Sequence, residues 1–360
     1  MTDEPLLKAT VAVFKVDGEL RGDLSRDLVR LEVEEDTAGL RTLSARFLAF
    51  GPRGSEPEER LLYLDGDPFD FGKRIEVSLG SPEEERLVFK GQLSAIEADF
   101  EEGAEPEVVV KAEDELMKLR MKRRSRTWEK KTDAQIAEAI AGEHGLAAEV
   151  DAPGPTYDVV QQWNLSDLAF LRERARRIQA ELGLLGGKLQ FKSRSARAGT
   201  EITLVRGNHL LSIQLRADLA HQRGKVKVSG YDASKRSRIE KEAGRDALAA
   251  EGSGGRSGVQ VVEDVLPGME SFRVREVPLK DDEAQDWARA EMLRRGRRFV
   301  TISGTTRGTP DLVVGSRLRL ERVGRPFEGG PYYVTRVQHT YDLRSAHRTH
   351  FDAERATVNS

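Results

Sequence analysis

The sequence contains no cysteine in its 360 residues. This absence excludes disulfide bonds, cysteine-ligated zinc, iron–sulfur clusters and catalysis by a thiol. The N-terminal segment, MTDEPLLKATVAVF, lacks the basic region followed by an apolar region that marks a secretory signal. No run of about 18 apolar residues occurs, so no transmembrane helix and no membrane insertion are expected. We therefore expect the chain to be made and folded in a reducing cytoplasm.

An excess of charge of one sign is also missing. The chain has 58 Lys and Arg against 61 Asp and Glu, which gives a formal net charge of −3. A protein that coats nucleic acid needs a basic excess, so no nucleic-acid binding is expected. Charged residues nevertheless make up 33% of the chain, above the usual share of about 25%, which indicates much polar surface. The length predicts two to three domains at about 150 residues each.

Residues 1–112 have the pattern of a first β domain. Apolar and polar residues alternate with a period of two, which is typical of half-buried strands. Several short strands within about 100 residues predict a small antiparallel barrel or sandwich. The segment 52–59, rich in Gly, Pro and charge, is predicted to be a surface loop. The expected strands are residues 10–16, 28–33, 43–48, 75–79, 87–91 and 108–110.

Residues 113–210 change to a mixed pattern that predicts an α/β insertion. Thr132 and Gln135 have the spacing of a helix capping box, and Gly145 is the expected end of that helix. A second helix is expected from Ser166, with Leu168, Leu171, Ala175, Ile178 and Leu182 on its apolar face and an end at Gly183. Its other face is expected to carry four arginines at the surface or at an interface: Arg172, Arg174, Arg176 and Arg177. Strands are expected at 188–192 and 201–205.

Residues 211–360 return to a β pattern and form the expected second β domain. Strands are predicted at 211–215, 225–231, 299–303, 317–320, 332–341 and 349–353. A flexible linker is expected at about 245–260, where the segment EGSGGRSG lies. A helix is expected at about 282–295, with Trp287 and Met292 on its apolar face.

Short segments recur between the two β regions. Residues 72–77 (GKRIEV) resemble 315–320 (GSRLRL), and 110–113 (VKAE) resemble 351–354 (FDAE). These matches indicate either a true duplication or a coincidence between short β patterns. A duplication would give two related β domains with an α/β insertion between them. The predicted fold class is therefore α+β, mainly β.

Candidate motifs for chemistry favour structural interpretations. His347 and His350 are three apart on a predicted strand, so their imidazoles should point to opposite faces of a solvated edge strand and hold no metal. Residues 304–309 (GTTRGT) lack the spacing of a phosphate-binding loop and are predicted to be a turn. Residues 118–131 carry eight basic side chains around Trp128, which suits either nucleic acid or an acidic partner surface. No GxSxG or HExxH motif occurs, and no carboxylate has an apolar context. We therefore expect no enzymatic activity, no catalytic, cofactor-binding or metal-binding residues, and no cofactor.

Three separated blocks carry a resemblance to a known family. They are residues 123–146, including RRSRTW and TDAQIA; residues 161–175 (QQWNLSDLAFLRERA); and residues 298–335, including RFV, GTTRG and GPYYVT. Together they resemble the phage late control protein D family, the baseplate hub of contractile tails. The same fold forms the head of the valine-glycine repeat protein G (VgrG) spikes of type VI secretion and of extracellular contractile injection systems.

The resemblance implies a structural hub that assembles as a ring-shaped homotrimer of chains with two related antiparallel β-barrel domains. Such a hub adapts a three-fold spike to a six-fold tail tube and nucleates tube assembly. Its implied partners are a separate spike protein, the first ring of tail tube protein and other baseplate proteins. The spike is expected to be a separate chain because no spike domain precedes Ser360. The implied location is the bacterial cytoplasm during assembly and then a phage tail, tailocin or injection particle, including particles released from the cell.

One alternative of another class remains open. The capped helix at 132–145 with its flanking strands also resembles a LysM carbohydrate-binding module. This interpretation predicts a cell-wall, peptidoglycan-binding protein or a hydrolase accessory. Binding of insoluble peptidoglycan by the isolated protein distinguishes it from a hub.

Overall fold

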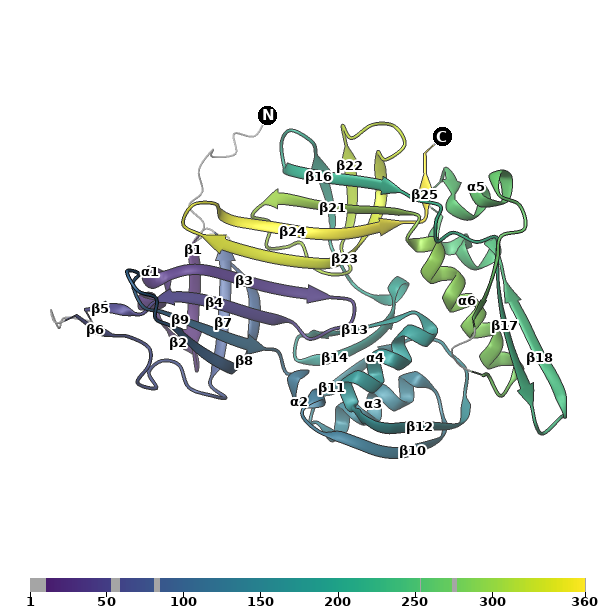
Figure 1. Ribbon diagram of the computed structural model, residues 1–360, viewed down its shortest axis with the longest axis horizontal. Coiled ribbons are helices and arrows are strands. Elements are labelled where there is room, and N and C mark those ends of the chain that lie inside the picture. Colours follow the sequence, from purple (N-terminus) through teal and green to yellow (C-terminus); the bar gives the residue numbers. More distant parts are fainter. Residues whose placement is uncertain (1–10, 53–58, 81–84, 253, 274–276, 360) are drawn as a thin grey trace.

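The computed structural model describes residues 11–52, 59–80, 85–252, 254–273 and 277–359. In this part of the chain, thirteen strands form one sheet that consists of two halves (Figure 1). Most of the helices and smaller sheets lie below and beside this large sheet, whereas one short helix and one hairpin lie at its left end (Figure 1). The chain is therefore mainly β with an α/β part, as the sequence predicts. None of the described helices is long and apolar enough to cross a membrane.

The first half-sheet is built from residues 11–113. Its strand order is β3-β4-β9-β8-β7-β1, and short β2 (Glu19–Leu20) extends it. Apolar residues on alternate positions of these strands form one core, centred on Phe14, Phe47 and Phe89. A short helix, α1 (Gly22–Asp27), and a hairpin of β5 (Phe50–Pro52) and β6 (Glu59–Leu61) complete this part. The six main strands are β1 (Val11–Val16), β3 (Leu28–Asp36), β4 (Thr42–Leu48), β7 (Arg74–Gly80), β8 (Arg86–Asp99) and β9 (Glu107–Glu113).

The second half-sheet is built from residues 201–355 and has its own core. That core includes Leu318, Tyr332 and Phe351. The strand order is β16-β21-β24-β23-β22-β15. The strands are β15 (Glu201–Val205), β16 (Leu210–Ala217), β21 (Val300–Arg307), β22 (Arg317–Glu321), β23 (Gly329–Asp342) and β24 (Ala346–Arg355).

The two half-sheets have the same topology. Numbered from one to six along the chain, the strands lie in the order 2-3-6-5-4-1 in both. The repeated segments occupy equivalent positions: 72–77 and 315–320 lead into and form β7 and β22, and 110–113 and 351–354 lie in β9 and β24. Gly72 and Gly315, which begin the first repeat, both have a positive φ, 80° and 95°. One pairing differs, because β1 is antiparallel to β7 whereas β15 is parallel to β22.

A single ladder joins the two half-sheets. The second part of β23 pairs with β3 from Arg336 opposite Asp36 to Asp342 opposite Arg30. An ion pair between Arg336 and Glu34, 2.7 Å apart, lies on this ladder. The large sheet is therefore continuous from β16 at one end to β1 and β2 at the other.

The remaining elements share a third core. It includes Ile136, Leu171 and Phe191 from the middle of the chain together with Val226 and Met292 from the later part. Several apolar residues of the later part thus pack with the α/β region, whereas Val261 packs against the core of the second half-sheet. The middle elements are α2 (Met117–Arg120), β10 (Arg123–Lys131), α3 (Asp133–Glu143), β11 (Ala147–Asp151), β12 (Tyr157–Ser166), α4 (Asp167–Ile178), β13 (Ala180–Leu185), β14 (Lys188–Ser193) and the 3₁₀ turn η1 (Arg194–Ala196). The later ones are β17 (Lys225–Asp232), β18 (Ser237–Ala243), η2 (Arg245–Glu251), β19 (Arg256–Ser257), α5 (Gly258–Val265), β20 (Glu270–Arg273), α6 (Asp281–Arg297) and β25 (Thr357–Val358).

The helices agree with the sequence in part. The capping box of α3 is confirmed, since Thr132 Oγ1 accepts the Gln135 N–H and Gln135 Oε1 accepts the Thr132 N–H. The end of α4 was expected at Gly183, but the helix ends at Ile178, because Gln179 adopts a left-handed conformation with φ 56°. Leu182, expected on the helix, lies in β13 and is buried there.

Three loop predictions also need correction or fall outside the described residues. The linker expected at about 245–260 forms η2, β19 and the start of α5, which Ser257 and Gln260 cap; Ser253 lies outside the described residues. The turn expected at 304–309 is a strand as far as Arg307, because Thr305 and Thr306 pair with β24. Of the surface loop expected at 52–59, residues 53–58 lie outside the described residues.

Candidate functional site

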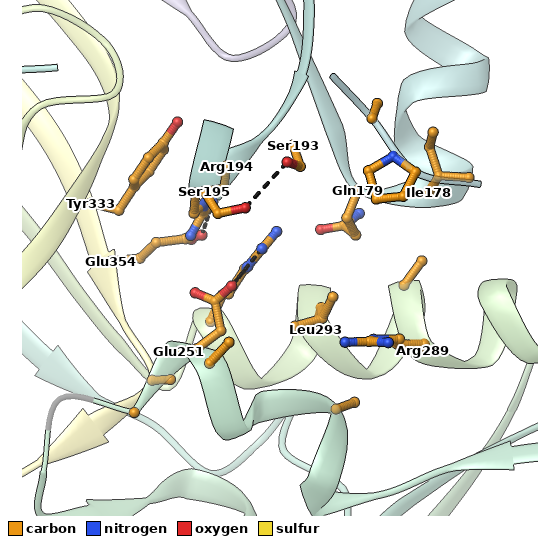
Figure 2. A pocket seen from close by; sticks show the side chains of 18 of the residues that line it. Ile178, Gln179, Ser193, Arg194, Ser195, Glu251, Arg289, Leu293, Tyr333 and Glu354 are labelled. Atoms are coloured by element: carbon orange, nitrogen blue, oxygen red, sulfur yellow. Dashed lines mark hydrogen bonds and ion pairs between the residues drawn. The ribbon is translucent and has the colours of Figure 1, made fainter. Parts of the chain in front are cut away.

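A pocket of about 650 Å³, which we call the junction pocket, lies between the elements of the third core and the second half-sheet. One wall is the C-terminal end of α4 with the turn after β14, and the opposite wall is α6 with η2 (Figure 2). A third wall comes from the second half-sheet through Tyr333 and Glu354. The pocket is therefore bounded by segments far apart in the sequence.

Ion pairs connect the walls of this pocket. Arg194 donates from Nη2 to Glu354 Oε1 at 2.6 Å, and its guanidinium lies 4.0 Å from the centre of the Tyr333 ring (Figure 2). Arg297 of α6 donates to Glu251 Oε1 at 2.6 Å. Burial disfavours the charged form of Glu251, but the attraction and hydrogen bond of Arg297 outweigh it and lower its pKa.

The chemistry of the pocket is that of a structural junction. The guanidinium groups of Arg194 and Arg297 have carboxylate partners, and buried Arg355 donates to backbone carbonyl oxygens of other residues, as buried charges require. The hydroxyls of Ser193 and Ser195 lie 3.2 Å apart and hydrogen-bond to each other. Burial also raises the pKa of the Tyr333 phenol, which donates a hydrogen bond to Glu181. These contacts hold η1 against β24 and η2 against α6.

The histidines predicted to lie on a solvated edge strand occupy a different place. His347 and His350 do point to opposite sides of β24, but this strand lies between β21 and β23 and is not an edge. His347 is buried, and its Nε2 lies 3.3 Å from Nδ1 of buried His339. Burial lowers the pKa of His339 to about 3 and that of His347 to about 4. In the described ranges, no three His, Asp or Glu side chains group in a way that could hold a metal ion.

The basic segment 118–131 is partly neutralised within the chain. Arg126 on β10 donates to Glu143 Oε1 at 2.7 Å and to Asp167 Oδ1 at 2.9 Å, and its guanidinium lies 4.3 Å from the Trp128 ring centre. Burial opposes ionisation of Asp167, but hydrogen bonds from His144 and Gln162 and the charge of Arg126 lower its pKa. Part of the acidic surface that the basic segment was expected to meet is therefore supplied by α3 and α4.

Several backbone edges of the large sheet are open among the described residues, and two of them have exposed apolar side chains nearby. The outer edge of β16 has no partner strand on the side away from β21. The final part of β8, residues 95–99, pairs with β9 on one side, whereas its pairing with β7 ends at Gln92. Apolar side chains are exposed beside both edges: Leu211 is 45% and Phe100 62% exposed. Sequence reasoning did not single out these residues, although the alternation of Leu211, Ile213 and Leu215 is a signal that could have found them.

A known family covers most of this architecture. The family described as the Alg8 N-terminal domain matches residues 53–342. The chain belongs to this Alg8 N-terminal domain family. The matched region begins within the first half-sheet, after β4, and runs through the α/β part to the end of β23, so β3 and β24 lie outside it.

Solved structures share the fold of this Alg8 N-terminal domain chain over nearly its whole length. The 43 kDa tail protein of prophage MuSo2 from Shewanella oneidensis has a TM-score of 0.70 at 12% identity, with 97% of this chain and 99% of that chain covered. The tail protein from Neisseria meningitidis MC58 has a TM-score of 0.67 at 11% identity, with 96% of each chain covered. The E. coli c3393 protein, a component of the type VI secretion system, has a TM-score of 0.58 at 12% identity, with 93% and 74% covered. No curated protein matches the sequence significantly.

Proposed function

We propose that the protein is a structural hub of a contractile tail or injection-system baseplate. The observation that carries this proposal is the shared fold with two phage tail proteins along nearly the full length of both chains. The c3393 protein adds support, since it belongs to a type VI secretion system and is similar to the T4 bacteriophage tail proteins gp27 and gp5. The sequence blocks that resemble the late control protein D family are consistent with the same role.

The proposed role follows from symmetry. A chain with two half-sheets of one topology presents two similar surfaces, so a homotrimer presents six towards a six-fold tube and three copies of any other surface towards a spike. In this proposal the partners are a separate spike protein, the first ring of tail tube protein and other baseplate proteins. The chain assembles in the bacterial cytoplasm and then forms part of the particle.

The proposal includes no catalytic step and no cofactor. The contacts of the junction pocket suit a rigid adaptor, because Arg194 and Arg297 form ion pairs with carboxylates of other segments. We also propose the division into two β-barrel domains, 1–112 and 211–360, and an α/β insertion, 113–210. In this division Val226, Trp287 and Met292 belong to the last part of the chain but share the core of the insertion.

Deletion and complementation test this function in the bacterium that makes the particle. Cells that lack the protein should assemble neither tube nor sheath, because the hub nucleates the tube, and the wild-type gene should restore both. A gene that encodes the His209→Ala variant, changed at an exposed position, should also restore assembly and injection fully in the deletion strain. Normal particles in the deletion strain would contradict the proposal, and specific retention of the isolated protein on peptidoglycan would favour the cell-wall alternative.

A further inference from the structure

We propose that the junction pocket and the cavity beside it bind an extended acidic segment of another protein of the particle. This inference rests on the proposed function, because it assigns the segment to a partner of the hub. Its evidence is the charge of the pocket wall, the arginines that have no carboxylate partner and the spacing of two arginines along α6.

The wall of the two cavities concentrates positive charge. The second cavity, of about 400 Å³, shares Gln179, Arg194 and Arg297 with the junction pocket, so the two lie side by side. Seven arginines and four carboxylates line them together, although the whole chain has a formal net charge of −3. A cleft lined mainly by charges of one sign attracts ligands of the opposite sign. The expected ligand is therefore anionic.

Most of these arginines have no carboxylate to neutralise them. Arg194 and Arg297 form ion pairs with Glu354 and Glu251 and hold the walls together. Three others donate to backbone carbonyl oxygens, which carry no full charge: Arg172, Arg317 and Arg355. The positive charge of these three guanidinium groups thus remains available to a ligand.

The last two arginines, Arg176 and Arg289, are exposed at the pocket walls. Their side chains donate no hydrogen bond to any residue in the described part of the chain. Arg289 lies on the α6 wall, apart from the carboxylates of Glu251 and Glu354 (Figure 2). Buried Arg297 bonds to Glu251 through Nε and Nη2, which leaves its Nη1 without a hydrogen bond to the described residues. Charged donors are therefore present both at the mouth and inside the pocket.

The spacing along α6 favours a chain segment over a small anion. Arg289, Leu293 and Arg297 lie at intervals of four residues and all line the junction pocket. At about 1.5 Å per residue, the two arginine backbones are about 12 Å apart, which is too far for one phosphate to contact both walls closely. In an extended segment, residues i and i+4 point to the same side and lie about 13 Å apart. Acidic side chains at i and i+4 therefore match the two arginines.

The pocket also offers contacts for the rest of such a segment. Between the two arginines lie Leu293 and, on the facing wall, Ile178, both half-buried, which suit an apolar side chain between the acidic ones. Gln179 donates from Nε2 to the Arg176 carbonyl oxygen, so its Oε1 can accept a backbone N–H of the segment. The volume of about 650 Å³ lies in the range of ligand-binding pockets, about 300–1,000 Å³.

The aromatic content of the wall disfavours nucleic acid as the ligand. Tyr333 is the one aromatic residue that lines either cavity in the described part of the chain, and it is buried. The guanidinium groups of Arg194 and Arg317 lie 4.0 Å and 4.4 Å from the centre of its ring. The ring is therefore occupied, whereas single-stranded nucleic acid needs aromatic faces on which bases stack.

Calorimetric titration of the purified full chain with a short peptide tests the inference. The probe is Glu-Val-Thr-Val-Glu, acetylated and amidated so that its termini carry no charge, at millimolar concentration and low salt. We expect saturable binding. The peptide Gln-Val-Thr-Val-Gln should bind at least about tenfold more weakly, because it loses the charged hydrogen bonds. Glu-Val-Thr-Glu-Val should also bind more weakly, because its acidic side chains point to opposite sides of an extended chain.

A pair of double variants assigns the binding to the pocket. Arg176→Ala with Arg289→Ala removes the two exposed pocket arginines and should weaken binding at least about tenfold. Arg294→Ala with Arg298→Ala removes two exposed arginines at the end of α6 that line neither cavity, and should bind as the wild type does. Urea unfolding of all proteins confirms that the variants are folded. Equal binding by both double variants would overturn the assignment.

Three further outcomes would also overturn the inference. They are no binding of the peptide, binding of pyrophosphate as tight as that of the peptide, and binding of an oligothymidylate that depends on Arg176 and Arg289. Complementation separates this inference from the proposed function. If the wild-type gene restores tube and sheath in the deletion strain but the peptide does not bind, the inference alone fails. Normal particles without the protein would overturn the proposed function as well.

Discussion

At the scale of single residues, Arg174 is the side chain whose environment departs most from the sequence prediction. It was expected on the charged face of α4, but it is 1% exposed and donates a hydrogen bond to buried Asp133. Its guanidinium lies 4.3 Å from the Tyr157 ring centre, and the Tyr157 hydroxyl donates to the same carboxylate at 3.0 Å. The helical spacing could have predicted this burial, because Arg174 lies three residues after Leu171 and therefore on the apolar side of the helix.

We predict that Arg174→Ala lowers the free energy of unfolding by about 3–5 kcal/mol. The substitution leaves the Asp133 carboxylate buried without its cation, and this lowers the free energy of unfolding far more than the loss of a surface ion pair does. Arg176, two residues later and exposed, is the matched control, and Arg176→Ala should change stability by no more than about 0.5 kcal/mol. Denaturant unfolding measures both, and a larger loss from Arg176→Ala would mean that the helix face is assigned wrongly.

At the scale of elements, the strands and the first helix cap follow from local sequence, whereas their pairing does not. Alternation of apolar residues locates most strands of both half-sheets, and Thr132 with Gln135 locates the start of α3. The end of α4 depends on the left-handed Gln179, a conformation that no local pattern specified. The ladder between β3 and β23 joins residues about 300 positions apart, so only the folded chain reveals it. The open edges of β16 and of the final part of β8 could not be predicted for the same reason.

The cross-strand pair of His339 on β23 and His347 on β24 predicts a pH dependence. Their folded-state pKa values, about 3 and about 4, lie below the ordinary value of 6.5. Below pH 6.5 these histidines therefore bind protons in the unfolded chain but not in the folded chain. Stability is therefore lost as the pH falls from about 6.5 towards 4, by about 2 kcal/mol for each histidine between pH 7 and 5. Asp114 acts in the opposite direction, because burial raises its pKa to about 6.

A comparison of variants isolates the histidine contribution, since the effect of Asp114 is common to all of them. The double variant His339→Gln, His347→Gln should lose about 4 kcal/mol less than the wild type between pH 7 and 5. His209→Gln, at an exposed position, should retain the wild-type dependence. Urea unfolding at several pH values gives these differences, and an unchanged dependence in the double variant would contradict the buried-pair explanation.

At the scale of the whole molecule, the repeated topology is the feature that links fold and role. The sequence repeats indicated it through two short segments, and the strand order extends it to six strands in each half. The junction pocket lies between the third core and the second half-sheet, where the Arg194–Glu354 ion pair joins the α/β part to the second half-sheet. Such a body suits a rigid component of a ring, in which each chain supplies two similar surfaces.

The measurement that tests this claim most directly is the mass of the native assembly. Multi-angle light scattering on the purified protein at micromolar concentration, alone and with the spike chain of its particle, compares that mass with the 40.2 kDa of one chain. The account predicts a species of three chains, with or without bound spike. A strict monomer under both conditions would contradict it.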